Sequence, residues 1–466
     1  MLVIESLGLI LAAILVVVLT VRSRLLFPCV AAVFVMVEFM TPLPRFSVGP
    51  VDLYVSDFLY LLALLNLVVR FGFDRKEIPR EAWIATGLCV LYMSYLAISE
   101  FYYWYYLDHI ALDKMFRAVV RATYPIVVIS ILFSLRPSDM KLYSKVLLIT
   151  LGCVLTKFFY VEIFAADGFR TSSGTIRNLP GEVMVILHFA IVYPLFYSNL
   201  PKYLRLGLIA ACVLAIGLIG HRSGFLSLLM IVGLFGLYVF YSGKAAGLIG
   251  RNILILCFSG ILVTLFVFFF KGEAVDRIFT RAADLTDTSL SSTTDRLNKW
   301  NLALQTTMEN PIGGTKFNLL PDYYGHRISE AAFGNFDPAK AHKRMVYLQT
   351  DRTWPPHNMF INIVSKNGVI GLMLFLAIVV YSLRLVMAQS DLRYKFFCLS
   401  WIGGNFVHLT FNNAHYPEVL IPLYLSLVVF PILFGYAHAN SHKEDKTKAS
   451  VADNSREVSI VRPGDA

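Results

Sequence analysis

The sequence predicts an all-α fold, a polytopic transmembrane helical bundle with one large loop outside the membrane. Three observations predict it. The 466 residues are 57% hydrophobic and only 15% charged, with a mean hydropathy of +0.64, too apolar for a soluble multidomain protein. Apolar runs long enough to cross a bilayer recur along the chain. Lys and Arg cluster in the short connections between these runs, as in polytopic membrane proteins.

The apolar runs predict about 12–13 spans. The expected spans cover residues 3–20, 25–41, 53–70, 82–100, 117–135, 145–165, 182–198, 206–220, 223–241, 252–270, 367–384, 397–413 and 418–437. The chain should therefore divide into a first set of spans (1–270), a large polar loop with short helices (271–356), an interfacial helix with the last spans (357–437) and a disordered tail (438–466). The N-terminus is expected to be a retained span rather than a cleaved signal peptide.

Basic residues orient the bundle. Most Lys and Arg of the short connections fall on one side, which the positive-inside rule assigns to the cytoplasm together with the tail. The opposite side, which carries the loop 271–356, holds few: Arg45, Lys114, Arg117, Arg121, Arg170, Arg177 and Arg222. Topology thus explains the net charge of +10, and no nucleic acid partner is expected. The six cysteines lie in apolar runs, so neither a disulfide framework nor a thiolate metal site is indicated.

The stretch 352–372 marks the return from the polar loop to apolar sequence. Pro355 and Pro356 forbid helix before His357, and the residues from Asn358 onward have a helical pattern. The imidazole should therefore stand at a helix start that faces water. Counting the span from Asn367 leaves roughly 18 residues, enough to cross a bilayer. Residues 357–366 are then an interfacial helix at the mouth of that span.

A second helix is predicted inside the loop. The Ser-Ser-Thr-Thr run 291–294 supplies N-cap candidates, and Arg296, Trp300 and Leu304 follow at helical spacing. The Asn-Pro pair at 310–311 and the Gly pair at 313–314 should end this helix. Arg296 and Trp300 are expected to share one face.

Two arginines are candidates for binding a diphosphate. Arg222 lies in a Gly-His-Arg-Ser-Gly turn between two apolar runs, close to lipid headgroups. Guanidinium groups grip phosphate oxygens in a bidentate fork, so Arg222 and Arg296 together could clamp a diphosphate. The plainer alternatives are a snorkelling arginine for Arg222 and a solvated helix charge for Arg296.

His357 is the candidate general base, because an imidazole with a pKa near 6.5 can accept the proton of an attacking hydroxyl. It could instead position the acceptor or have no catalytic role. Secondary candidates are Arg170 and Arg177, in an outer loop whose Gly and Ser let backbone amides approach phosphate. A further cluster near the last outer turn comprises His408, Asn412, Asn413 and His415.

Three motifs together resemble the O-antigen ligase and O-antigen polymerase superfamily: GHRSGFLSLL, DRLNKWNLALQTTMENPIGG and PHNMFINIVSKNGVIGLMLF. In that family an arginine follows a span, a second arginine precedes a Trp, and a His-Asn pair opens the span after a large periplasmic loop. The resemblance covers roughly residues 220–375. Two positions depart from the pattern, since His221 replaces a small polar residue and Lys366 replaces an acidic one.

The resemblance implies a multi-pass protein of the bacterial inner membrane that performs glycosyl transfer at the periplasmic face. The donor would be an undecaprenyl-diphosphate-linked glycan, and the acceptor lipid A core or another lipid-linked glycan. His357, Arg296 and Arg222 would be catalytic. The expected substrate-binding residues are Arg170, Arg177, Trp300, His221 and Asn358. No metal and no cofactor are expected, since the loop lacks an Asp-x-Asp pair and two arginines can neutralise the leaving group.

The alternative class is a lipid-linked oligosaccharide flippase or another polysaccharide transporter. Such proteins tend to have repeated halves with charged or broken helices near the midplane. Here the candidate residues gather at one predicted surface beside one long loop, which favours the enzyme. The sequence leaves ligase and polymerase undecided, because the two share the donor and differ in the acceptor.

Overall fold

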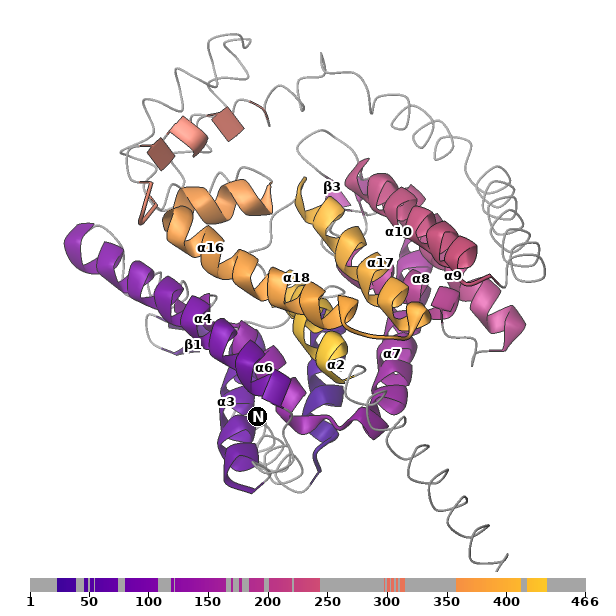
Figure 1. Cartoon of the computed structure of the whole chain (residues 1–466), viewed down its shortest axis with the longest axis horizontal. Helices are drawn as coiled ribbons and strands as arrows, with labels where there is room; N and C mark the ends of the chain where they lie inside the picture. The colour runs from indigo at the N-terminus through magenta and orange to yellow at the C-terminus, as the bar shows by residue number, and fades with distance from the viewer. Residues whose placement is uncertain are drawn as a thin grey trace, which may run out of the picture.

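The computed structural model confirms a helical bundle (Figure 1). It describes residues 23–38, 46–48, 51–53, 55–73, 80–107, 119–120, 122–164, 169–170, 176–177, 184–196, 201–219, 222–243, 358–411 and 417–433, and, from the long loop, 297, 300–301, 303–305, 307–308 and 311–314. The predicted spans 3–20 and 252–270, most of the loop and the tail lie outside these residues.

The longer helices follow the predicted spans closely. They are α2 (Leu26–Glu38), α3 (Val55–Phe73), α4 (Arg80–Leu107), α6 (Pro125–Ser134), α7 (Met140–Phe164), α8 (Met184–Phe196), α9 (Lys202–Ile219), α10 (Arg222–Tyr241), α16 (Met359–Met387), α17 (Leu392–Leu409) and α18 (Pro417–Tyr424). A short 3-10 turn (Pro137–Asp139) precedes α7. Apolar residues on all sides, rather than one apolar stripe, produce these helices, as expected for segments solvated by lipid.

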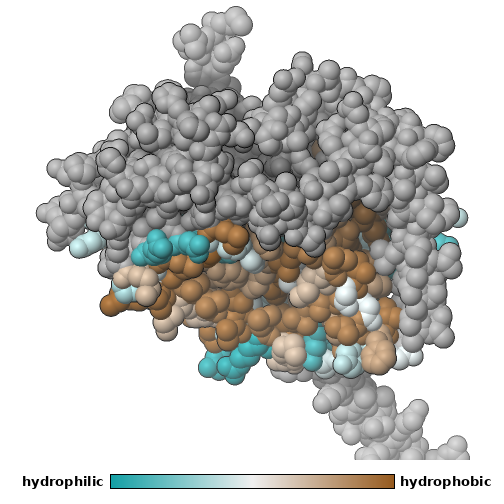
Figure 2. Space-filling model, turned by 90° about the horizontal axis from the view of Figure 1, so that it is seen from above, coloured by the Kyte–Doolittle hydropathy of each residue, from teal (hydrophilic) through white to brown (hydrophobic). Residues whose placement is uncertain are grey.

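By length and composition, four helical stretches in the described residues could cross a membrane: Arg80–Tyr102, Pro137–Tyr160, Ser223–Tyr241 and Met359–Met387. Large apolar side chains on α4 and α10 face outward, with Ile98 68% and Phe240 75% exposed. Figure 2 shows the resulting band of hydrophobic surface, with hydrophilic residues toward its borders. Such a band matches a lipid-facing belt.

Two ends of the bundle can be distinguished by contacts. At one end α8 finishes, and its last carbonyls accept hydrogen bonds from Arg205 of α9 (Nη2 to Leu195 O, 3.4 Å) and from Nε of Arg393, which bonds Phe196 O. Cations at a helix C-terminus oppose the partial negative charge there. Both arginines belong to the basic set assigned to the cytoplasm. We call this the Arg393 end.

At the other end α10 and α16 begin and α17 finishes, so α17 runs antiparallel to both. We call this the His408 end. Glycines let α10 pack closely on its neighbours: a Cβ on Gly404 of α17 would lie 2.9 Å from Cδ1 of Ile231. A Cβ on Gly224 would likewise lie 3.1 Å from Cε of Met184 at the start of α8. The backbones at this end are therefore held close together.

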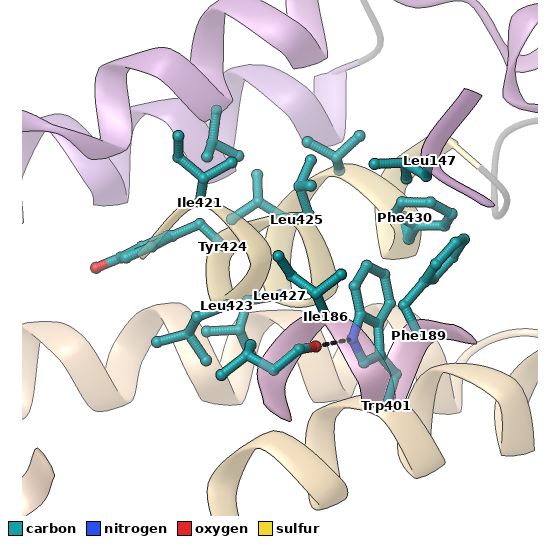
Figure 3. Close-up of a cluster of buried hydrophobic side chains, with 14 of the residues drawn as sticks. Leu147, Ile186, Phe189, Trp401, Ile421, Leu423, Tyr424, Leu425, Leu427 and Phe430 are labelled. Atoms are coloured by element: carbon teal, nitrogen blue, oxygen red, sulfur yellow. Dashed lines mark hydrogen bonds between the residues drawn. The ribbon is translucent and has the colours of Figure 1, made fainter. Parts of the chain in front are cut away.

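The core between α7, α8, α17 and α18 is apolar and combines aliphatic side chains with several aromatic rings (Figure 3). Trp401 lies edge-on to Phe430 with ring centroids 4.9 Å apart, and its indole N–H donates to Val185 O at 3.4 Å. Phe189 completes the cluster, 4.9 Å from Trp401. A cavity of about 20 Å³ lies beside them, room for about one water. It is lined almost entirely by apolar side chains, so it is no substrate pocket.

α18 leads into a π-helical segment, Leu425–Val429. Pro422, within α18, has no N–H to donate and so disturbs the regular ladder just before it. Side chains of neighbouring helices bond the carbonyls in this region: Ser382 Oγ donates to Leu427 O, and Tyr394 donates to Phe430 O at 3.0 Å. The last helical region is thereby tied to α16 and α17.

Two short antiparallel ribbons were not predicted. β1 (Phe46–Val48) pairs with β2 (Val51–Leu53), and β3 (Phe169–Arg170) pairs with β4 (Ile176–Arg177). Their sequences hold β-branched and aromatic residues around Gly, Pro and Ser, which is a hairpin signal. The segments were too short to stand out against the apolar runs.

Candidate functional site

α16 is bent near its start, close to the boundary predicted between interfacial helix and span. Gly368 has φ 65° and ψ −171°, a conformation that favours glycine, and it separates a short first arm from the long arm of α16 (Figure 1). The first arm begins at Asn358, whose Oδ1 accepts from the backbone N–H groups of Phe360 and Ile361 at 3.0 and 3.1 Å. Asn358 is therefore a helix N-cap.

Residues 311–314 follow the helix predicted inside the loop, which we call the loop helix, and they pack on this bend. The N–H of Val369 donates to Pro311 O at 2.8 Å. Gly314 has φ +75°, and a Cβ there would lie 2.4 Å from the backbone nitrogen of Gly368. The hydroxyl of Tyr95 of α4 donates to Asn367 O at 2.7 Å and also lies 3.4 Å from Ile312 O. We call this contact between residues 311–314 and 366–369 the loop latch.

The helix predicted inside the loop is present. Residues 297, 300–301, 303–305 and 307–308 are helical, and a turn follows at 311–313, where Pro and Gly were expected to stop it. Ala303 is buried, and the ring of Trp300 lies 6.3 Å from that of Phe411, just beyond the end of α17. The loop helix thus packs on the His408 end of the bundle.

The start of α10 is bonded to α17 by a pair of buried side chains. Ser223, next to Arg222, is 3% exposed, and His408 is fully buried. Ser223 Oγ and His408 Nδ1 are 3.0 Å apart. This bond joins the first turn of α10 to the last turn of α17.

The end of α17, residues 406–411, therefore meets all three motif segments. Phe406 packs edge-on against Phe360 of the first arm of α16, with centroids 5.8 Å apart. His408 bonds Ser223 and Phe411 packs on Trp300. Segments separated by some 140 positions in the sequence converge on two turns of one helix. The described residues thus assemble the framework that the site hypothesis requires.

Most of the predicted site residues flank this framework. Arg222 is the first residue of α10, while its side chain lies outside the described residues, as do His221, Arg296 and His357. Arg222 adjoins Ser223, and His357 adjoins Asn358. Arg296 precedes Trp300 by four positions, one helical turn. The catalytic roles of Arg222, Arg296 and His357, and the positions of their side chains relative to one another, stay predictions.

Arg170 and Arg177 lie on the ribbon of β3 and β4, where Phe169 pairs with Arg177 and Arg170 with Ile176. The ribbon brings these two segments together, and their side chains lie outside the described residues. A role of either arginine in binding substrate stays a prediction.

Several buried or half-buried polar residues were not predicted from the sequence to have a role. His188 of α8 is fully buried, with Nδ1 2.9 Å from Asn405 Oδ1, and its ring lies 5.9 Å from that of His408. Tyr95 was missed as well. Asn405 and His408 stand three apart on α17, a spacing that places them on one helix face. That spacing, and the presence of a His within the apolar run 184–196, were the sequence signals that could have identified these residues.

Metal ligands are not clustered in the part of the chain that the structure describes: no group of three His, Cys, Asp or Glu side chains there is placed to hold an ion. The carboxylates of the long loop 271–356, such as Asp284 and Asp287, lie outside the described residues.

Comparison with known families agrees with the sequence motifs. Residues 207–376 match the family described as O-antigen ligase (Wzy_C). The matched segment includes α10, the loop helix, the latch and the first part of α16, and it contains all three motifs. No curated protein matches the chain. The match covers 170 of the 466 residues, and it shows that this segment is similar to the O-antigen ligase family.

Proposed function

We propose that this protein transfers a glycan from an undecaprenyl-diphosphate-linked donor to an acceptor hydroxyl, because residues 207–376 match the O-antigen ligase family. The acceptor is lipid A core or a second lipid-linked glycan. The main support is the convergence of the three motif segments on residues 406–411 of α17. A site made from three distant segments requires that they meet at one place.

We place the reaction at the His408 end, on the periplasmic face of the bacterial inner membrane. Support comes from the arginines of the opposite end, since Arg205 and Arg393 belong to the basic set that the positive-inside rule assigns to the cytoplasm. The long loop 271–356 then lies outside and covers the site. The loop helix and the latch are the described parts of that cover.

The chemistry follows from the residue types. The acceptor hydroxyl oxygen attacks the anomeric carbon of the donor sugar, the bond from that carbon to the diphosphate oxygen breaks, and undecaprenyl diphosphate leaves. His357 accepts the hydroxyl proton, an effect usually worth about 10² to 10⁴ in rate. Arg222 and Arg296 neutralise the charge that grows on the leaving diphosphate, and no metal is needed for this.

The remaining site residues bind substrate in this proposal. Trp300 presents an aromatic ring beside the end of α17 and offers a stacking surface for a sugar. Asn358 caps α16, so any contact of its side chain with substrate is made in addition to that bond. His221 flanks Arg222, and Arg170 and Arg177 lie on the β3–β4 ribbon.

The test is transfer by purified protein in detergent, with a lipid-linked glycan donor and candidate acceptors, followed as a shift in product size. We expect His357→Ala and Arg296→Ala to remain in the membrane fraction and to lose transfer. Lys202→Ala is the matched control, because Lys202 is an exposed cation at the Arg393 end. A flippase only moves its substrate across a sealed membrane and does not join glycan to acceptor. Transfer in detergent would therefore also exclude that alternative. Full activity in both variants would falsify the proposal.

A further inference from the structure

A chain of buried polar side chains runs beneath the proposed site. It begins at Ser223 and His408, 3.0 Å apart, and His408 meets the ring of His188 nearly edge-on, at 77°. All three residues are at most 3% exposed. Polar groups inside a membrane domain are costly unless they are bonded, and those that persist there are candidates for function.

The chain continues away from His188 with defined donors and acceptors. Asn405 Oδ1 can only accept, so His188 Nδ1 donates to it, at 2.9 Å. Asn405 Nδ2 then donates to Ser426 Oγ at 3.2 Å, and Ser426 donates to Leu423 O at 2.7 Å. The polar chain therefore links α10, α17, α8 and the π-helical segment. The ring of His188, held in this way, packs against the imidazole of His408.

Ser223, where this chain of side chains begins, adjoins Arg222 in the sequence. Ser223 also accepts, through its backbone carbonyl, a bond from Ser227 Oγ at 2.7 Å. The neighbouring Gly224 packs so closely on Met184 and Ile216 that a Cβ there would lie 3.1 and 3.2 Å from their side chains. The first turn of α10 is thus held on two sides. Its backbone carries Arg222, and small displacements of such a residue cost much in rate.

We propose that His408 is a positioning residue, which holds the first turn of α10 through Ser223 and so places Arg222 against the diphosphate of the donor. The inference rests on the proposed function, because it assigns a second residue to the same reaction. His188 and Asn405 serve His408 by fixing its ring. Neither His408 nor His188 touches the substrate.

The experiment measures kcat and KM of glycan transfer for purified Ser223→Ala and His408→Leu. We expect each to lower kcat per folded molecule by roughly ten- to a hundredfold, because Arg222 loses its placement. The double variant should lose no more than either single one, since both remove the same bond. His408→Asn, which keeps a polar atom near the position of Nδ1, should recover most of the rate.

A second set of variants separates positioning from ordinary stability. In an Arg222→Lys background, Ser223→Ala should change kcat by less than about twofold, because the placement of the guanidinium no longer matters. Tyr394→Phe is the matched control: it removes a buried bond of 3.0 Å from the opposite end of α17, and its kcat should stay normal.

The outcomes distinguish the two proposals. If the wild-type protein transfers no glycan, the proposed function fails and this inference falls with it. If the wild type transfers glycan while Ser223→Ala stays within twofold of it, only the positioning role is wrong. The positioning role would also be wrong if Ser223→Ala lowered kcat by the same factor in the Arg222→Lys background as in the wild type. It would be wrong as well if the loss of activity matched the loss of folded protein.

Discussion

The two ends of α17 use polar side chains in different ways. At the Arg393 end, Arg393 and Tyr394 bond backbone carbonyls of α8 and of the segment after the π-helical turn. At the His408 end, Asn405 and His408 bond other side chains, which belong to α8, α10 and the π-helical segment. Carbonyl bonds satisfy helix ends. Bonds between buried side chains fix the orientation of particular residues.

The difference supports the proposal that the reaction takes place at the His408 end. Satisfying a helix terminus needs only a donor of adequate reach, and any basic residue can supply one. A network of side chains is costly unless each member finds its partner, so it specifies one arrangement. That arrangement lies at the end where the three motif segments meet. The two ends should therefore respond differently to mutation, in rate at one end and in stability at the other.

The largest effect is expected from Arg222→Ala at the His408 end. Loss of one preorganised contact to the departing diphosphate should lower kcat about 10² to 10³-fold. Arg222→Lys should be intermediate, because an ammonium keeps the charge and loses the bidentate fork. Steady-state transfer assays on purified protein measure both. A wild-type kcat for Arg222→Ala would show that this end of the bundle does not bind the leaving group.

The second largest effect is expected from Gly368→Ala, because the added methyl group would disrupt the loop latch. A Cβ at Gly368 would lie 2.0 Å from Ile312 O, and the backbone has φ 65°. Clash and strain should together cost about 2 kcal/mol or more of the latched state. We expect loss of transfer and faster proteolysis within the loop 271–356. Gly233→Ala on α10, where nothing lies within 4 Å of the new Cβ, is the control and should behave as wild type.

Arg393→Ala tests the opposite end, where stability rather than rate should change. Removal of the guanidinium leaves the Phe196 carbonyl without this charged donor, which typically costs about 1.5–3 kcal/mol. The melting temperature in detergent should fall, while kcat per folded molecule stays near the wild-type value. A large drop in kcat at unchanged melting temperature would remove the distinction drawn between the two ends.

The sequence predicted the bundle well because lipid imposes a simple rule. Long apolar runs must form helices in a bilayer, so α10 and α16 began within a few residues of the expected positions. The boundary between interfacial helix and span was predicted at Asn367, because Lys366 interrupts the apolar run, and α16 bends at the neighbouring Gly368. The stop after the loop helix followed from Pro311 and the glycines.

Long-range pairing could not be predicted in the same way. His188 resembles any residue of an apolar run until α8 is placed beside α17, and only then does Asn405 become its partner. Tyr95 contacts Asn367, which is 272 positions away. Hydropathy predicts where helices lie along the chain, but it contains little information about which helix faces pack together. The two β ribbons were missed because a few residues of strand carry too weak a pattern.

The smallest expected effect is that of Tyr95→Phe. Together with Tyr381→Phe, this variant compares two hydrogen bonds between α4 and α16. Tyr95 donates to Asn367 O at 2.7 Å beside the latch, whereas Tyr381 donates to Glu81 O at 3.4 Å at the Arg393 end. Tyr95→Phe should destabilise the latch by about 1 kcal/mol and lower kcat a few-fold. Tyr381→Phe removes the longer bond and should leave kcat unchanged. Equal kcat values for the two variants would mean that α4 only stabilises the bundle and does not help to hold the loop over the site.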